Sequence, residues 1–251
     1  MGAPKVPRIT PYFWAIKLLS TALGEAISDY LVHSVNPYLA VTGGFVAFVI
    51  AIAIQFATPV YRSAAYWFAV VMVAVFGTMA ADVLHIQFGV PYVASAAAFA
   101  VALGSVFVAW FKAEGTLSVK SIDTRRRELF YWAAVLATFA MGTAVGDLAA
   151  YTAGLGFLMA GIVFAVAIAI PPLAHRYLGV NPILAFWSAY ILTRPLGASF
   201  ADWTGKARVA HSLGLGDGPV SFVLTIAIVA LVAYLAMTRK DSQTPPLPSL
   251  A

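Results

Sequence analysis

Four times along the chain, an aromatic residue and a tryptophan are followed at fixed distances by a glycine and an aspartate. The glycine comes ten residues after each Trp, and the aspartate comes five residues after the glycine. The copies are Phe13-Trp14/Gly24/Asp29, Tyr66-Trp67/Gly77/Asp82, Tyr131-Trp132/Gly142/Asp147 and Phe186-Trp187/Gly197/Asp202. Spacing conserved between segments of one chain is the mark of a tandem repeat. The chain is therefore predicted to contain four copies of one structural unit.

Composition indicates that these units face lipid. The chain is 62% hydrophobic and 10% charged, with a mean hydropathy of +0.89, which is too apolar for a soluble domain. Apolar segments long enough to cross roughly 30 Å of hydrocarbon lie near 12–33, 38–57, 64–86, 92–112, 129–150, 154–172, 181–203 and 219–238. We expect an all-α integral membrane protein with eight transmembrane helices, forming four parallel two-helix repeats in a pseudo-fourfold arrangement.

One membrane domain is expected over residues 1–251, with repeats at 12–57, 64–112, 129–172 and 181–238 and a disordered cytoplasmic tail at 239–251. Basic residues favour one side of the membrane: Lys5, Arg8, Arg62, Lys112, Lys120, Arg125, Arg126, Arg127, Arg176, Arg239 and Lys240 share it, and only Lys206 and Arg208 lie on the other. Because cytoplasmic loops retain basic residues, both termini are expected in the cytoplasm. The chain has no cysteine, which excludes disulfides and thiolate metal sites.

The first helix of each repeat carries the charged residues. Asp29, Asp82, Asp147, Asp202 and Glu25 lie in these helices, and an unpaired charge near the bilayer centre costs about 2.5 to 3.5 kcal/mol. We therefore expect the five acids to converge on a shared polar interior, where they bind an ion or form structural ion pairs. Beside them, the repeated glycines Gly24, Gly77, Gly142 and Gly197 are expected to let the helices pack closely.

Differences between the copies are also informative. The first copy adds Lys17 and Glu25, and the fourth adds Arg194 and Pro195. Lys17 and Arg194 are expected to pair with the acids or to gate the site, which would leave residual negative charge. Pro195 can either kink its helix or serve packing.

Two histidines follow aspartates on the same helix face, His33 four residues after Asp29 and His85 three residues after Asp82. This spacing could hold a divalent metal or relay a proton, but we favour interfacial or hydrogen-bonded roles for both. Lys206 lies four residues after Asp202, which predicts a structural ion pair. The tryptophans Trp14, Trp67, Trp132 and Trp187 are interpreted mainly as interfacial anchors.

With these motifs the chain, over about residues 10 to 240, resembles a family of bacterial membrane proteins of unknown function. That family is described as four tandem copies of a two-helix repeat with a characteristic tryptophan. The resemblance implies a bacterial inner membrane and supplies no activity.

The sequence has no nucleotide-binding loop, HExxH or GxSxG motif, so we expect neither an enzyme nor a cofactor. The leading hypothesis is a secondary transporter or permeation protein for a small cation, either a divalent metal such as Mn²⁺ or a proton-coupled ion. The alternatives are a non-transporting membrane scaffold or sensor with structural ion pairs, and a protein that takes an anionic or aromatic small molecule through Lys17 and Arg194. Expected partners are the lipid bilayer, the cation or proton, and a second copy of the chain, with no nucleic acid.

Overall fold

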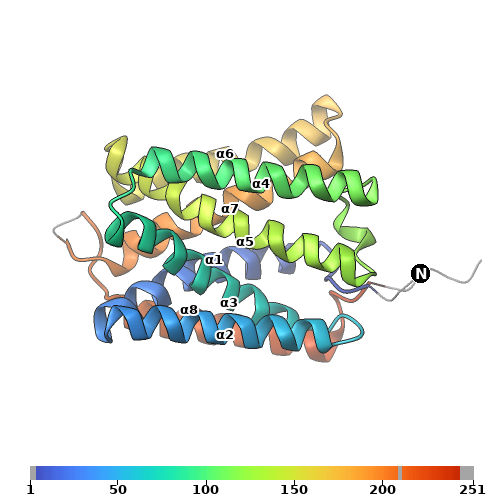
Figure 1. The fold of residues 1–251 in the computed structure, drawn as a ribbon, viewed down its shortest axis with the longest axis horizontal. Coiled ribbons are helices and arrows are strands. Elements are labelled where there is room, and N and C mark those ends of the chain that lie inside the picture. The colour runs from blue at the N-terminus through green and yellow to red at the C-terminus, as the bar shows by residue number, and fades with distance from the viewer. Residues whose placement is uncertain (1–3, 209–210, 244–251) are drawn as a thin grey trace, which may run out of the picture.

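The computed structural model describes residues 4–208 and 211–243, and over these residues the chain is helical, without strands. The α-helices are α1 (Pro11–Ser34), α2 (Pro37–Ala57), α3 (Ser63–Asp82), α4 (Tyr92–Glu114), α5 (Arg125–Asp147), α6 (Gly156–Leu178), α7 (Pro182–Gly205) and α8 (Asp217–Thr238). They run side by side along the long axis of the molecule (Figure 1). Their bounds lie close to the predicted segments, so the prediction of eight long helices is confirmed.

The first helices of the repeats form an inner ring, in which α1 packs against α3 and α7, and α5 packs against α3 and α7. The second helices lie outside this ring. Each packs mainly on the first helix of the following repeat: α2 on α3, α4 on α5, α6 on α7, and α8 back on α1. A repeat is thus completed by its neighbour, which explains why the unit occurs in tandem.

The repeated glycines are the points at which neighbouring inner helices touch. Each faces the residue that lies three positions before the glycine of the next copy, and a Cβ built on it would come within 3.0 Å of that residue. The facing pairs are Gly24 with Ala74, Gly77 with Phe139, Gly142 with Arg194, and Gly197 with Thr21. The last pair joins α7 to α1, so one contact repeated four times closes the ring.

Local sequence signals fix the helix starts. The side chain of Thr10 accepts a hydrogen bond from the backbone N–H of Phe13 ahead of α1, and Asn181 caps α7 in the same way. Pro11 and Pro182 follow directly at the first helical position, where a missing N–H costs nothing.

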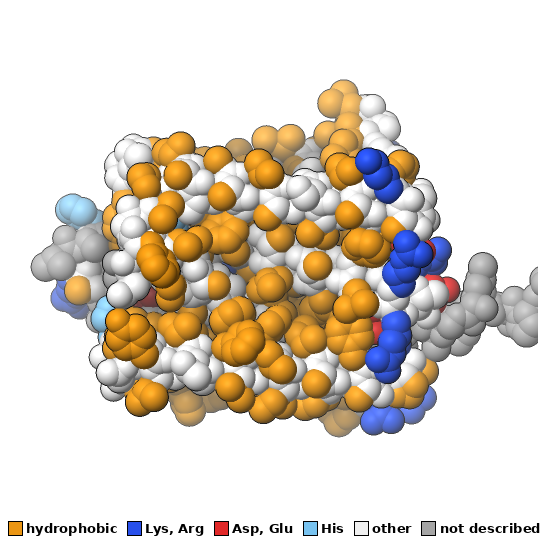
Figure 2. Space-filling view, in the orientation of Figure 1, with side chains coloured by type: hydrophobic (Ala, Val, Ile, Leu, Met, Phe, Trp, Pro, Cys, Tyr) orange, Lys and Arg blue, Asp and Glu red, His pale blue; other side chains and the backbone are white. Residues whose placement is uncertain are grey.

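The outer surface of the bundle is apolar, as Figure 2 shows for one face, where Lys and Arg gather at the end from which the N-terminal segment emerges. Among the described residues, six helices are long and apolar enough to cross a membrane: α2, α3, α4, α5, α6 and α8. These helices mark a membrane protein built of internal repeats.

Residues 239–243, the first five of the predicted tail, contact the helical bundle. Asp241 is 1% exposed; its carboxylate accepts hydrogen bonds from Tyr61 and Ser63, and its carbonyl accepts one from the backbone of Arg8. A buried acceptor with three partners holds this segment against the bundle. The remainder of the predicted tail, 244–251, lies outside the described residues.

Candidate functional site

The repeated aspartates meet at the end of the bundle opposite the chain termini. A cavity of about 480 Å³ opens there, lined by Glu25, Asp29, His33, Asp82, His85, Tyr92, Asp147, Tyr151, Gly205, Lys206, Ala207 and Asp217. Asp202 lies just behind this wall and is 3% exposed. The expectation that the acids converge on one chamber is therefore confirmed, and Asp217, at the start of α8, is a lining residue that the sequence analysis missed.

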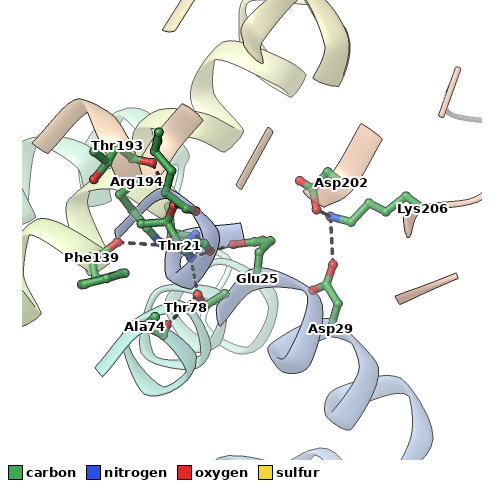
Figure 3. Close-up of polar contacts among 12 residues, drawn as sticks. Thr21, Glu25, Asp29, Ala74, Thr78, Phe139, Thr193, Arg194, Asp202 and Lys206 are labelled. Carbon is green, nitrogen blue, oxygen red and sulfur yellow. Dashed lines mark hydrogen bonds and ion pairs between the residues drawn. The ribbon is translucent and has the colours of Figure 1, made fainter. Parts of the chain in front are cut away.

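Lys206 is the cation of this cavity. Its ammonium lies 3.0 Å from Asp202 and 3.3 Å from Asp29, so it joins α7 to α1 (Figure 3). The predicted pair with Asp202 is confirmed, and the second contact was not foreseen. Burial disfavours the charged ammonium, but the attraction of Asp202 and then of Asp29 outweighs it and raises the pKa of Lys206 well above its ordinary value. Lys206 is thus protonated at neutral pH.

One group of carboxylates is close enough to share an ion. Glu25, Asp29 and Asp202 each present an oxygen, and these oxygens lie within 4.8 Å of one another. Oxygen donors of this kind suit hard or borderline cations. The group combines the first and fourth repeats.

Asp82 and Asp147, from the second and third repeats, have different surroundings. Within the described part of the chain, neither carboxylate has a lysine, arginine or histidine nitrogen within 4.0 Å. Directly after each aspartate the helix widens into a π-helical turn, η1 (Val83–Gln87) and η3 (Leu148–Thr152). Single π turns of this kind are frequent at functional sites, and here they supply His85 and Tyr151 to the cavity wall.

One helical turn deeper, Arg194 crosses the centre of the ring. Its guanidinium donates hydrogen bonds to Glu25 at 2.6 Å, to Thr143 at 2.8 Å, to Thr78, and to the carbonyl oxygen of Thr21 at 3.1 Å. These acceptors come from α1, α3 and α5, as Figure 3 shows in part. The expected pairing of Arg194 with an acid is confirmed. Thr78 and Thr143 occupy the position of Glu25 in the second and third repeats, and both also accept hydrogen bonds from Arg194.

Among the described residues Lys17 has no acidic partner, so of the two roles expected of it, pairing and gating, the first is not seen. Its side chain is 1% exposed, and its ammonium lies 4.0 Å from the ring centre of Phe139 and 4.3 Å from that of Tyr190. Within the described structure no hydrogen-bond acceptor reaches the ammonium. Because the helical register places Lys17 two turns below Glu25, the aromatic faces are the partners it meets.

Both histidines reach the cavity but are bound to backbone. The Nδ1 of His33 lies 2.7 Å from the carbonyl oxygen of Asp29, and the Nδ1 of His85 lies 3.1 Å from that of Val90. Nε2 is the remaining ligand atom of each ring, and that of His85 lies 3.4 Å from the hydroxyl oxygen of Ser95. The arrangement agrees with the hydrogen-bonded role that the sequence favoured.

Three of the four repeated tryptophans are buried inside the bundle. Trp67, Trp132 and Trp187 are at most 5% exposed, and Trp187 donates a hydrogen bond to the carbonyl oxygen of Leu117 at 2.9 Å. They form an aromatic layer inside the bundle with the residues that precede them in the motif. Only Trp14, which is partly exposed, keeps the expected surface position.

A family profile described as a Repeat of Unknown Function (DUF347) matches the chain four times, at residues 12–61, 65–116, 130–178 and 185–241. The chain belongs to this DUF347 repeat family. Each match spans most of one inner helix and the outer helix that follows it. No curated protein and no solved structure matches the chain.

One buried ion pair, between Lys5 and Glu128, lies outside the matched repeats and was not predicted from the sequence. At the end of the bundle where α1 begins, the ammonium of Lys5 lies 3.2 Å from Glu128, which is fully buried. The side-chain amide of Gln55 donates a hydrogen bond to the other carboxylate oxygen of Glu128 at 2.9 Å. Glu128 lies between the second and third matched segments, 65–116 and 130–178, so no recurrence pointed to it. The contact closes the end of the bundle opposite the carboxylate cavity.

Proposed function

We propose that the protein is a secondary transporter of a small cation, either a divalent metal such as Mn²⁺ or an ion exchanged for protons. The observation that carries this proposal is the cavity in which Asp29, Asp82 and Asp147 meet. Lys206 is the one lysine or arginine among its described lining residues, and Asp82 and Asp147 have no ion-pair partner there. A cavity with excess negative charge concentrates cations.

Transport by alternating access fits the interior better than an open pore does. Below the cavity the axis is occupied by Arg194, and further in by Lys17 between aromatic rings. An ion in the cavity can therefore proceed only if the inner helices rearrange. Four parallel repeats around an axis along the membrane normal supply a framework for such a movement.

We place the protein in a bacterial inner membrane with eight spanning helices. In this proposal the less apolar α1 and α7 cross the bilayer inside the shell of outer helices, where their charged residues avoid lipid. Positive residues at the end holding the termini put that end in the cytoplasm. The carboxylate cavity then faces the outer side.

The test is flux into liposomes containing the purified protein, measured with a Mn²⁺-sensitive dye and, separately, with a pH-sensitive dye. The native protein should show flux in at least one assay, and Asp82→Asn and Asp147→Asn should lose most of it while remaining folded. Equal flux in the native protein and both variants would overturn the proposal, as would the absence of flux in both assays.

A scaffold or sensor is the second candidate, because Arg194 ties α7 to three other inner helices. Under that hypothesis substitution of any repeated aspartate would lower stability, without a separate effect on flux. The third candidate, an anionic or aromatic ligand held by Lys17 and Arg194, has less support. Neither residue lines the carboxylate cavity, and both are at most 1% exposed.

A further inference from the structure

Lys206 places an ammonium where the carboxylates of the cavity come closest together. It contacts Asp29 and Asp202, two members of the group whose oxygens lie within 4.8 Å of one another. The chain thus supplies its own cation to the part of the cavity best suited to bind one.

We propose that Lys206 is a tethered competitor, whose ammonium fills the carboxylate group of Glu25, Asp29 and Asp202 while the cavity is empty and withdraws when a cation enters. This inference rests on the proposed function of the cavity as a cation site. It assigns Lys206 a regulatory role. When no cation is bound, the ammonium of Lys206 compensates the negative charge of these carboxylates.

The position of Lys206 allows the side chain to move without unfolding the bundle. It is the first residue after α7, and its side chain is 24% exposed, compared with 1% for Arg194. The backbone around it is held independently, since the N–H of Lys206 bonds to the carbonyl of Asp202 and Gly216 bonds to Gly205. A flexible four-carbon stem can therefore swing toward solvent from a fixed anchor.

The recurrence of the motif supports this reading. Four residues after the repeated aspartate the first copy has His33 and the third has Tyr151, and only the fourth has a lysine. The substitute cation is therefore an addition to one repeat and is not part of the packing that all repeats share.

A competitor of this kind has a measurable consequence. A ligand binds more weakly in proportion to the fraction of protein in which its site is free. If the ammonium is docked about nine-tenths of the time or more, its removal tightens cation binding by roughly tenfold or more. Loss of a purely structural lysine would instead leave affinity unchanged or weaken it.

The experiment is a calorimetric titration of Mn²⁺ into the purified full-length protein at constant pH and ionic strength. It compares native protein, Lys206→Met and the control Arg208→Met. Arg208 belongs to the same loop and is exposed, with its guanidinium bonded to the carbonyl of Leu213. We expect Lys206→Met to bind Mn²⁺ at least about tenfold more tightly, and Arg208→Met to stay within about threefold of native.

A second measurement covers the case in which Lys206→Met does not fold. Native protein is treated briefly with acetic anhydride with and without Mn²⁺, and acetylation is quantified by mass spectrometry. Mn²⁺ should increase acetylation of Lys206 and leave that of the exposed Lys120 unchanged.

The outcomes separate this inference from the proposed function. If Mn²⁺ binds and Asp82→Asn weakens it, but Lys206→Met does not tighten it and Lys206 stays protected, the cation site stands and the competitor is refuted. If neither native protein nor Lys206→Met binds Mn²⁺, the inference fails together with the metal form of the proposed function.

Discussion

The inner ring holds charged side chains at two levels, one helical turn apart. The two levels differ in how far these charges are paired. At the deeper level Arg194 meets one carboxylate, Glu25, and its other described hydrogen bonds also go to protein groups. At the outer level lie four carboxylates, Asp29, Asp82, Asp147 and Asp202, and the ammonium of Lys206 pairs with two of them, Asp29 and Asp202. At the deeper level the charge of Arg194 is matched by that of Glu25, whereas the outer level opens to the cavity and retains excess negative charge.

This difference explains which level is suited to binding. Removing one partner of a buried ion pair leaves the other charge buried and uncompensated, which is expensive. A cavity with uncompensated carboxylates gains stability when a cation enters. Substitutions at the deeper level should therefore affect folding most, whereas those at the outer level should affect function.

The largest effect is expected from Arg194→Met, which leaves Glu25 buried without a partner. We expect a loss of about 3 to 5 kcal/mol in the free energy of unfolding, measured by denaturant titration in detergent micelles. Arg176→Met, at an exposed arginine of α6, should change it by less than about 0.5 kcal/mol. The double variant Arg194→Met/Glu25→Gln should recover much of the loss, because it removes both charges of the pair. A stable Arg194→Met variant would remove the distinction between the two levels.

The sequence predicted the repeat, the helices and the gathering of acids, because these depend on patterns that recur. Recurrent spacing identifies the inner helices, and the cost of charge in lipid requires their acidic faces to turn inward. Which charged side chains pair with each other depends instead on their position along the inner helices and on the length of each side chain within the closed ring. Lys17 was expected to pair with an acid or to gate the site, and its register places it among aromatic rings.

Contacts between distant segments were beyond sequence reasoning for a related reason. Glu128 and Lys5 meet because the N-terminal segment folds back over the end of the bundle where α1 begins, and neither residue lies within a matched repeat. The same is true of Asp241, whose partners Tyr61 and Ser63 precede or begin α3. Asp217 enters the cavity only because α8 packs back on α1.

The next largest effect concerns the ring contact that both levels depend on. In Gly24→Ala the new methyl group would overlap the side chain and backbone of Ala74 on α3. Backbone yields less easily than a flexible side chain, so we expect a loss of about 1 to 3 kcal/mol in unfolding free energy. The matched control is Gly104→Ala on α4, where a Cβ meets nothing within 4 Å and a small gain in helix stability is expected. Equal effects at the two sites would argue against glycine-mediated closure of the ring.

A smaller effect of opposite sign is expected at Lys17, below the deeper level. Lys17→Met should raise the unfolding free energy by about 1 kcal/mol, because an apolar chain replaces a buried ammonium without an acceptor. The aromatic faces of Phe139 and Tyr190 already offset part of that cost, which limits the gain. Lys112→Met, at an exposed lysine, controls for loss of positive charge. Destabilisation by Lys17→Met would mean that the aromatic contacts stabilise the ammonium by more than its burial costs.

The smallest effect on stability is expected at Asp82, and it separates the two levels most sharply. Asp82→Asn keeps the shape of the side chain and breaks no described ion pair, so the unfolding free energy should change by less than about 1 kcal/mol. In the same liposomes the variant should lose cation flux, because the carboxylate is part of the open site.

Asp202→Asn is the matched comparison to Asp82→Asn, since it alters the same position of the repeat but removes a partner of Lys206. It should lower stability more than Asp82→Asn does, because the ammonium then keeps only Asp29. The two variants are compared by unfolding and by flux on the same preparations. If Asp82→Asn unfolds the protein as readily as Arg194→Met does, the outer carboxylates are structural and the cavity is a by-product of packing. If it stays folded and loses flux, the repeated aspartate has a role that its contribution to folding does not explain.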